Sequence, residues 1–518
     1  MANNQAREEL FKALSYLCDH VIYGGGTSPV DFRSYVFCTI FYRFLSEDLQ
    51  NYINDNERAA GVADFEYANI SDEDAETIRD EIARIKGFFI RPSELFCNFV
   101  KQMDTDENVN ETIVKIFSNI QSSSQGYPSA ENFAGLFDSF SINGNLLGAN
   151  LDAKRKQIRI LFQKISEVDF GGTEGHNDLL GDAYEFLMSW YAAHAGKKGG
   201  QFFTPSCVSE LLARIALHGR TKVNKVYDGA CGSGSLLLKA NKILGRENVI
   251  DGFYGQELDF ETERLCRMNM FMHGVPYNKF CIRQGDTLLN PRHDAEQPFQ
   301  CIVMNPPYSV PWEGDSNPIL ISDQRFSPAG VLAPKSKADF AFIMHALSYL
   351  SNDGTAAIVT FPGIMYRSGA EQKIRKYLID NNYVDAVIQM PGSLFYSTSI
   401  SVDLLILKKS RTDNKVTFID ASEIFSPATN QNVLSDDNQA EIYNLYAHRE
   451  EVAHKAHLAD YEEIVKNGYN LSVSSYVEKE NDREEIDIDA LNTEIAEIVK
   501  KENELRAAID DIIREIGR

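Results

Sequence analysis

The chain has 518 residues, enough for roughly two to four domains and a large hydrophobic core. It carries 51 Lys and Arg residues against 75 Asp and Glu residues, a net charge of −24. This balance argues against tight binding of DNA or RNA by this chain alone, because non-specific affinity comes mainly from Lys and Arg on phosphates. A nucleic-acid substrate would therefore require a basic partner.

Targeting and metal-binding signals are weak. The segment after Met1 is polar, and no apolar run approaches the length of a membrane span. The eight cysteines are scattered without metal-ligand or redox spacing, so we expect reduced core thiols and a cytoplasmic protein. His454 and His457 lie three residues apart on an expected helix without further ligands nearby, so no metal site is expected.

Residues 1–165 are predicted to form a helical N-terminal domain. Two apolar stripes follow helical spacing, one over 10–17 and one over 37–45, and Gly24, Gly25 and Gly26 separate them. From about residue 200 the pattern changes, and strands are expected at 223–227, 249–254, 279–283, 300–304, 356–359, 384–388 and 402–407. Helical segments alternate with these strands, which indicates a mostly parallel, doubly wound α/β sheet.

The last 35 or so residues form a separate predicted unit. An apolar 4-3 heptad pattern, interrupted only by Glu502, runs through Leu491, Ile495, Ile498, Leu505, Ile509, Ile512 and Ile516. The stripe is narrow and its surroundings are highly charged. This favours packing along a helix of another chain over a terminal helix packed on its own domain.

A glycine-rich loop links the first predicted strand to a helix. It reads Asp228-Gly229-Ala230-Cys231-Gly232-Ser233-Gly234-Ser235, so that its backbone can approach a ligand at a helix N-terminus. Leu237 stands where a dinucleotide-binding loop has its third glycine, and no Lys-Ser/Thr pair of a P-loop is present. The loop therefore fits a cofactor without a pyrophosphate, such as S-adenosylmethionine.

Three acidic residues follow successive strands. Asp228 is placed to meet the amino group of the cofactor, Glu257 to accept from its ribose hydroxyls, and Asp286 to bond its adenine amine. Upstream, the segment 199–205 precedes a helix that begins near Ser206. Thr204 is expected to cap this helix, while Phe202 and Phe203 cover the cofactor or, alternatively, are ordinary core aromatics.

The segment Asn305-Pro306-Pro307-Tyr308 ends an apolar strand abruptly. Its rigid backbone suits a planar ring with an exocyclic NH2 group: the Asn305 oxygen and a proline carbonyl accept the two hydrogens, and Tyr308 stacks on the ring. The alternative is a rigid turn. The loop over 309–335, with Trp312, Arg325 and Phe326, is placed to fold over such a ring, or is an ordinary surface loop.

Three motifs follow one another along the chain: Gly-Gln-Phe-Phe-Thr-Pro at 200–205, the glycine-rich loop at 228–235 and Asn-Pro-Pro-Tyr at 305–308. In this order they resemble amino-group DNA methyltransferases of the N6-adenine type, in particular the modification subunit of type I restriction-modification systems. The segments 41–46, 178–185, 197–200 and 336–342 support the resemblance. Family members often have Pro where Gly229 stands and Ala where Cys231 stands; both changes leave the loop geometry plausible.

The resemblance implies a Rossmann-like S-adenosylmethionine-dependent methyltransferase core over 166–475, an all-α N-terminal domain over 1–165 and a C-terminal helical, partner-binding tail over 476–518. Asn305, Pro306, Pro307 and Tyr308 would hold the flipped adenine. The residues expected around the cofactor are Gln201, Phe202, Phe203, Thr204, Pro205, Ser206, Asp228, Gly229, Cys231, Gly232, Ser233, Gly234, Ser235, Glu257 and Asp286.

The resemblance also implies partners. In this family a specificity subunit reads the DNA sequence, usually with two modification subunits, and a restriction subunit can join them. Alternatives remain open at this point. Methylation of a protein glutamine side chain uses the same tetrapeptide, N4-cytosine methylation would fit the same pocket, and a scaffold that keeps the fold without catalysis is a third.

Overall fold

The computed structural model describes residues 10–12, 14–15, 29–170, 176–194, 204–395, 399–428, 431–479 and 488–517. By its internal contacts the chain divides into two compact units, Met1–Val477 and Glu478–Arg518. Within the described part, no helix is long and apolar enough to cross a membrane. All seven cysteines described are free, and Cys38, Cys231, Cys266 and Cys301 are buried, as expected of core thiols.

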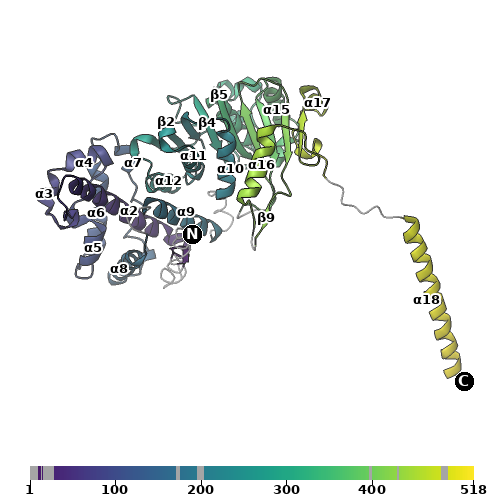
Figure 1. The fold of residues 1–518 in the computed structure, drawn as a ribbon, viewed down its shortest axis with the longest axis horizontal. Coiled ribbons are helices and arrows are strands. Elements are labelled where there is room, and N and C mark those ends of the chain that lie inside the picture. The colour runs from purple at the N-terminus through teal and green to yellow at the C-terminus, as the bar shows by residue number, and fades with distance from the viewer. Residues whose placement is uncertain are drawn as a thin grey trace. The chain divides into compact units, whose positions relative to one another are not determined.

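The first unit is built around one large sheet (Figure 1). Its order is β11-β8-β6-β7-β5-β4-β1-β2-β3. The bounds are β1 (Val223–Asp228), β2 (Val249–Glu257), β3 (Phe280–Gln284), β4 (Phe299–Met304), β5 (Leu350–Thr360), β6 (Val384–Gln389), β7 (Asp403–Lys408), β8 (Val416–Asp420) and β11 (Ala456–Ala459).

The sheet is mostly parallel, and the predicted α/β class is confirmed. β1 pairs in parallel with β2 and β4, β2 with β3, and β4 with β5. β7 lies antiparallel between β5 and β6, and β11 is antiparallel to β8. The sequence had not indicated β8 or β11. The expected helix through His457 is wrong, because that residue lies on β11 between Glu451 and Glu463.

Alternate residues of each strand face two separate hydrophobic clusters. On β4, Cys301 and Val303 belong to one cluster, and Ile302 and Met304 belong to the other. The first face is covered by α10 (Ser206–Ala216), α11 (Ser235–Leu244), α12 (Phe260–Met272) and α16 (Asp436–His448). The second is covered by α14 (Asp339–Tyr349), α15 (Ala370–Asp380) and α17 (Tyr461–Lys466). Burial on both faces explains the nearly continuous apolar runs of the central strands.

The N-terminal region is helical, as predicted. Its helices are α2 (Pro29–Ala59), α3 (Asp72–Glu76), α4 (Arg79–Lys86), α5 (Phe96–Gln102), α6 (Val109–Ser123), α7 (Ala130–Phe133), α8 (Leu151–Glu167) and α9 (His176–His194). The predicted apolar stripe lies on α2, where Phe37, Ile40 and Phe41 are fully buried. The stripe therefore forms the centre of the helical core, against α5, α8 and α9.

Helix α12 connects this helical region to the sheet. Arg267 on α12 donates through Nη1 to the backbone carbonyls of Glu131, Asn132 and Ala134, at 3.0, 3.0 and 2.9 Å. Its charge is balanced on the same helix by Glu263, which accepts from Nη2 at 2.9 Å. Because Arg267 is only 6% exposed, these bonds fix α12 firmly to the N-terminal region.

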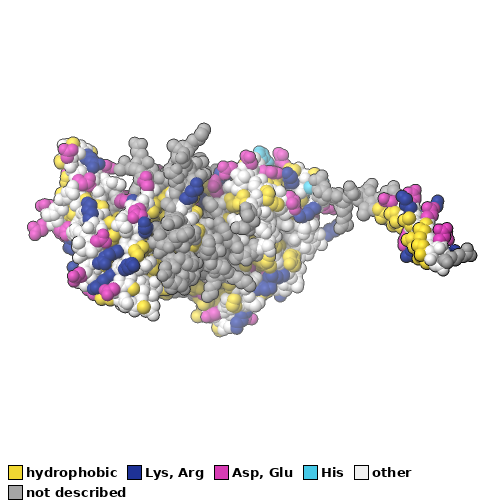
Figure 2. Space-filling model, turned by 90° about the horizontal axis from the view of Figure 1, so that it is seen from below, with side chains coloured by type: hydrophobic (Ala, Val, Ile, Leu, Met, Phe, Trp, Pro, Cys, Tyr) yellow, Lys and Arg dark blue, Asp and Glu magenta, His cyan; other side chains and the backbone are white. Residues whose placement is uncertain are grey.

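In the described part of the second unit, Ile488–Ile516 form the helix α18, as predicted from the heptads. The seven apolar heptad side chains, from Leu491 to Ile516, are between 49% and 80% exposed. Figure 2 shows them as a yellow stripe flanked by charged side chains. An apolar stripe of this kind is typical of helices that associate with other helices.

Candidate active site

The predicted site residues lie at one edge of the sheet. Asp228 ends β1, Glu257 ends β2, Asn305 follows β4 directly, and Asp286 stands two residues beyond β3. These four strands are parallel neighbours, so their carboxyl ends meet at the same edge. Residues 201–203, which include Gln201, Phe202 and Phe203, lie outside the described part of the chain.

Asp228 is fully buried beneath the glycine-rich loop. Its Oδ1 accepts from the backbone N–H of Ala230 at 3.0 Å, whereas its buried Oδ2 has no hydrogen-bond partner. Burial raises the pKa of Asp228 to about 8, and the nearby Glu257 carboxyl adds to the rise. An ammonium group would give the unpaired oxygen a partner and favour the ionised carboxylate.

The loop needs its glycines. Gly232 and Gly234 have φ of +52° and +81°, a left-handed conformation that side chains disfavour. A Cβ on Gly234 would lie 2.8 Å from the sulfur of Cys266. The Ser233 carbonyl accepts from Asn269 of α12 at 2.8 Å, and Ser235 begins α11. The loop thus turns tightly and places the start of α11 at the sheet edge, as expected of a ligand cradle.

Glu257 connects the second strand to this loop. Its Oε2 accepts from the N–H of Gly232 and its Oε1 from the N–H of Asp259, both at 3.0 Å. The backbone of the loop is also tied to β2, since the N–H of Cys231 donates to the Gln256 carbonyl at 3.0 Å. Burial raises the pKa of Glu257. The carboxylate therefore stabilises the backbone of the loop. Each of its oxygens still has a free lone pair that can accept a hydrogen bond from a ligand hydroxyl.

Asp286 shapes the turn after β3. Its Oδ1 accepts from the N–H groups of Leu288 and Leu289 at 2.9 and 3.1 Å. Two apolar side chains beside the acids had not been singled out from the sequence: Leu258 is 63% exposed and Leu289 is 40% exposed. The sequence feature that could have indicated them is a leucine that shortly follows an acidic residue at the end of a strand. Exposed apolar side chains there suit the face of a flat ring.

The side-chain amide of Asn305 is held at both ends. Its Nδ2 donates to Oγ1 of Thr204 at 2.9 Å, and its Oδ1 accepts from the hydroxyl of Tyr308 at 2.5 Å. The expectation that Thr204 caps the next helix is therefore wrong. Pro205 is the N-cap of α10, no side chain caps this helix, and Ser206 is its exposed first residue. The Thr204 hydroxyl is instead placed against the predicted catalytic residue.

The two prolines lead into a constrained turn. Ser309 has φ of +51°, and its N–H lies 3.1 Å from both carboxylate oxygens of Asp339, the first residue of α14. Tyr308 is partly buried, and burial followed by the charge of Asp339 raises its pKa. Tyr308 is therefore a neutral hydrogen-bond donor at physiological pH.

The loop after the tetrapeptide has its own core. Trp312, Arg325 and Phe326 are 9%, 8% and 2% exposed, and the rings of Trp312 and Phe326 meet at 5.4 Å between centroids. The three side chains therefore pack within the loop, and its folding over a base stays a prediction. Burial of an arginine in a polar segment is hard to foresee, because it depends on carbonyls supplied by a distant turn.

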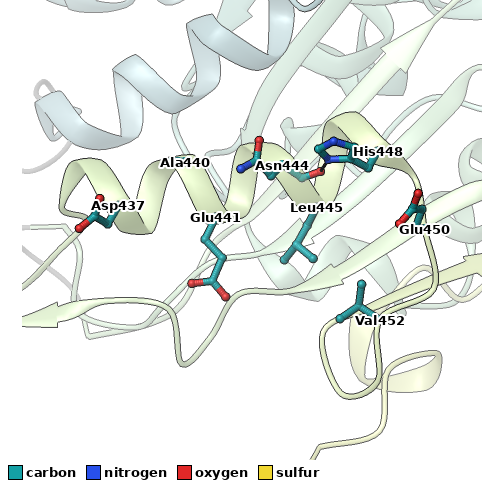
Figure 3. Close-up of a pocket in the computed structure, with 8 residues that line it drawn as sticks. All are labelled: Asp437, Ala440, Glu441, Asn444, Leu445, His448, Glu450 and Val452. Carbon is teal, nitrogen blue, oxygen red and sulfur yellow. Dashed lines mark hydrogen bonds between the residues drawn. The ribbon is translucent and has the colours of Figure 1, made fainter.

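A cavity of about 440 Å³ lies elsewhere, along the outer side of α16 (Figure 3). None of the predicted site residues is in its lining, which consists of Asp437, Ala440, Glu441, Asn444, Leu445, His448, Glu450 and Val452. In the part of the chain that the structure describes, no group of three or more His, Cys, Asp or Glu side chains is arranged to hold a metal ion.

Comparison with known proteins shows the family of the chain. Residues 175–485 match the family model described as N-6 DNA Methylase, and residues 9–165 match the HsdM N-terminal domain. The chain is 46% identical over 504 residues to the type I restriction enzyme MpnII methylase subunit of Mycoplasma pneumoniae, across 94% of this chain and 92% of that protein. The chain belongs to the methylase subunits of type I restriction enzymes.

Solved structures support this membership. The methyltransferase subunit of a type I restriction-modification system from Streptococcus thermophilus matches with a TM-score of 0.82 at 34% identity, over 91% of this chain and all of that one. A modification subunit of a type I restriction enzyme from Vibrio vulnificus has the same fold, with a TM-score of 0.60 at 19% identity, over 93% and 97% of the two chains.

The predicted activity, methylation of the N6 amino group of adenine in DNA by a modification subunit, is confirmed at the level of the family. The alternatives, a glutamine methyltransferase and a non-catalytic scaffold, are not favoured.

Proposed function

We propose that this methylase subunit binds S-adenosylmethionine along the carboxyl edge of β1, β2 and β3. The observation that carries the proposal is the unpaired, buried Oδ2 of Asp228, which suits the amino group of the cofactor. Glu257 would accept from the ribose hydroxyls, and Asp286 from the adenine amine. The residues of the glycine-rich loop and of the segment 201–206 would surround the remainder. When bound, the cofactor supplies an electrophilic methyl group.

The target base would be held by Asn305, Pro306, Pro307 and Tyr308. Oδ1 of Asn305 and the carbonyl of Pro306 would accept the two N6 hydrogens, and Tyr308 would stack on the flipped ring. Two acceptors draw N6 toward tetrahedral geometry and free its lone pair, which in planar adenine is delocalised into the ring. Catalysis is then positioning plus stabilisation of developing positive charge on N6. Asn305 is a poor base, so the proton leaves to water after transfer.

Sequence selection would be the task of another chain. The net charge of −24 is unfavourable for holding DNA alone, and the exposed stripe of α18 offers a surface for the helices of a specificity subunit. We expect a complex of a specificity subunit with two modification subunits, to which a restriction subunit can be added.

The test uses Asn305→Ala in the complete complex. Methyl transfer from labelled S-adenosylmethionine to DNA should fall below detection, while cofactor affinity by isothermal titration stays within about twofold, because Asn305 is proposed to bind the base and is not among the residues proposed to bind the cofactor. Asn150→Ala is a matched control: Asn150 caps α8 in the N-terminal region, accepting from Ala153 at 2.8 Å, so its loss should cost about 1 kcal/mol of stability without affecting methylation. Normal methyl transfer by Asn305→Ala would refute the proposal that Asn305 accepts a hydrogen bond from the N6 amine.

A further inference from the structure

Arg325 joins the loop after the Asn-Pro-Pro-Tyr motif to the turn that carries Asp286. Its guanidinium donates to the backbone carbonyls of Thr287 at 2.9 Å and Leu288 at 2.7 Å. Its charge is balanced by Asp323, whose Oδ2 lies 2.7 Å from Nη2. One buried side chain therefore connects the segment after β4, on the base side, with the segment after β3, on the cofactor side.

The turn that Arg325 contacts is a single hydrogen-bonded unit. Oδ1 of Asp286 accepts from the N–H groups of Leu288 and Leu289, so the carboxylate and the carbonyls bound by Arg325 belong to the same few residues. The hydroxyl of Thr287 donates to the Gly229 carbonyl at 2.5 Å, which ties this turn to the glycine-rich loop. Displacing the turn would displace the carboxylate.

His345 fixes the orientation of the guanidinium. Its Nδ1 lies 3.2 Å from Nη1 of Arg325, and its Nε2 lies 2.8 Å from the hydroxyl of Tyr227. Because an arginine can only donate, Nδ1 must be an acceptor and the imidazole is neutral, with its proton on Nε2. Burial, and then the charge of Arg325, lower the pKa of His345 well below its usual value, in agreement with a neutral ring.

We infer that Arg325 is a positioning residue that holds Asp286 in place for the adenine amine of S-adenosylmethionine. The inference rests on the proposed function, since that function provides the ligand of Asp286. It makes cofactor affinity depend on a loop that belongs to the base-binding side of the site. Lysine at position 325 would keep the charge beside Asp323 but lacks the planar fork that reaches both carbonyls, Asp323 and His345 at once.

The test is a double-mutant cycle on cofactor affinity, measured by isothermal titration of the full chain with S-adenosylmethionine. Arg325→Lys and Asp286→Asn should each weaken binding about tenfold, the order expected for a lost charge-assisted hydrogen bond. Asn keeps the Oδ1 acceptor that closes the turn. If Arg325 acts through Asp286, the double variant should also lose about tenfold, whereas independent effects would multiply to about a hundredfold and overturn the inference.

Arg375→Lys is the control for a purely structural effect. Arg375 is 1% exposed and donates to the backbone carbonyls of Ile364, Arg367 and Tyr469, none of which is proposed to bind the cofactor. This variant should lower the melting temperature and leave cofactor affinity unchanged. An affinity loss as large as that of Arg325→Lys would show that any buried arginine matters equally, and would overturn the inference.

A milder variant covers the case in which Arg325→Lys does not fold. The Asp323 side chain is 20% exposed, and Asp323→Asn leaves Arg325 present but without its charge partner. We expect about threefold weaker binding, again non-additive with Asp286→Asn. An unchanged affinity in Asp323→Asn would then count against the inference. If the wild-type chain itself does not bind S-adenosylmethionine, the proposed function fails, which is a distinct result from unaltered binding in the variants.

Discussion

The hydroxyl of Tyr308 donates a 2.5 Å hydrogen bond to Oδ1 of Asn305, the atom proposed to accept the target amine. The carbonyl oxygen has two lone pairs, so this bond occupies one of them and leaves the other for the N6 amine. When the Tyr308 ring turns onto the base, the bond breaks and the N6 amine can take its place on Asn305.

Tyr308→Phe separates the two tasks of this residue. The variant keeps the ring and removes the competing hydroxyl, so we expect methylation to continue with kcat within about threefold of wild type and an equal or lower KM for DNA. Tyr308→Ala should lose about tenfold or more in kcat/KM, because base stacking on an aromatic ring is worth about 1–3 kcal/mol. Steady-state kinetics of the assembled complex measures both. Equal losses in Phe and Ala variants would mean that the hydroxyl, and not the ring, is required.

Thr204→Val removes the acceptor that holds Nδ2 of Asn305 at 2.9 Å, with little change of shape. Without this bond the amide can rotate, and Oδ1 of Asn305 faces the N6 amine for a smaller fraction of the time. We therefore expect kcat to fall about tenfold, a typical cost for an unsatisfied polar group. Thr204→Ser keeps the hydroxyl and should retain most of the activity. A Val variant as active as the Ser variant would rule out this positioning role.

Cofactor binding should depend on pH through Asp228, whose pKa is raised to about 8 by burial. Below that pH the carboxyl is largely protonated and must lose its proton to pair with an ammonium group. Affinity should therefore rise with pH up to about 8, by at most about tenfold per pH unit. The cofactor's own amino group titrates equally in Asp228→Asn, so the comparison of the two proteins by titration between pH 6 and 9 isolates the contribution of Asp228. Identical pH profiles of cofactor affinity in the two proteins would contradict a role of Asp228 in binding the cofactor.

The same group has the opposite effect on folding. In the unfolded chain an Asp titrates near 4, whereas Asp228 in the folded protein titrates at about 8. Between these values the folded state binds more protons, so the contribution of Asp228 to stability falls as the pH rises and levels off above about 8. Asp228→Asn should flatten this part of the stability curve in urea unfolding.

Helix α18 should decide assembly with the specificity subunit. Ile509→Asp places a charge in the apolar stripe at a side chain that is 55% exposed, so the fold should survive while co-purification with the specificity subunit is lost. Ala507→Asp lies on the opposite side of the helix and should leave the complex intact. Cofactor binding by the isolated chain should be unaffected in both. Retention of the complex by Ile509→Asp would place the partner contact elsewhere.

Much of the sheet could be predicted because its strands are short, apolar and bounded by turn residues. The seven expected strands correspond to β1–β7. The direction of one strand could not be predicted from the sequence. The run 403–408 is buried on both faces, so its sequence is the same for a parallel strand as for the antiparallel strand that pairs with β5 and β6. β8 is buried at all five positions and β11 has only four residues, so neither shows a clear alternation of apolar and polar side chains.

The site was predictable where it depends on local sequence and not where it depends on contacts over long separations. The strand ends place Asp228, Glu257 and Asn305 together, because parallel strands share an edge. The bond from Asn305 to Thr204 spans 101 residues, so Thr204 was assigned to the nearest helix instead. Arg325 reaches carbonyls 37 and 38 residues away, which a reading of its polar surroundings does not suggest.

The position of α12 has a mechanical consequence. One end of its contacts is Arg267, bonded to three carbonyls of the N-terminal helical region; the other is Asn269, two residues on, bonded to the Ser233 carbonyl in the glycine-rich loop. A tilt of the helical region against the sheet would therefore displace the glycine-rich loop through these bonds. The position of the helical region and the affinity for the methyl donor would then be coupled.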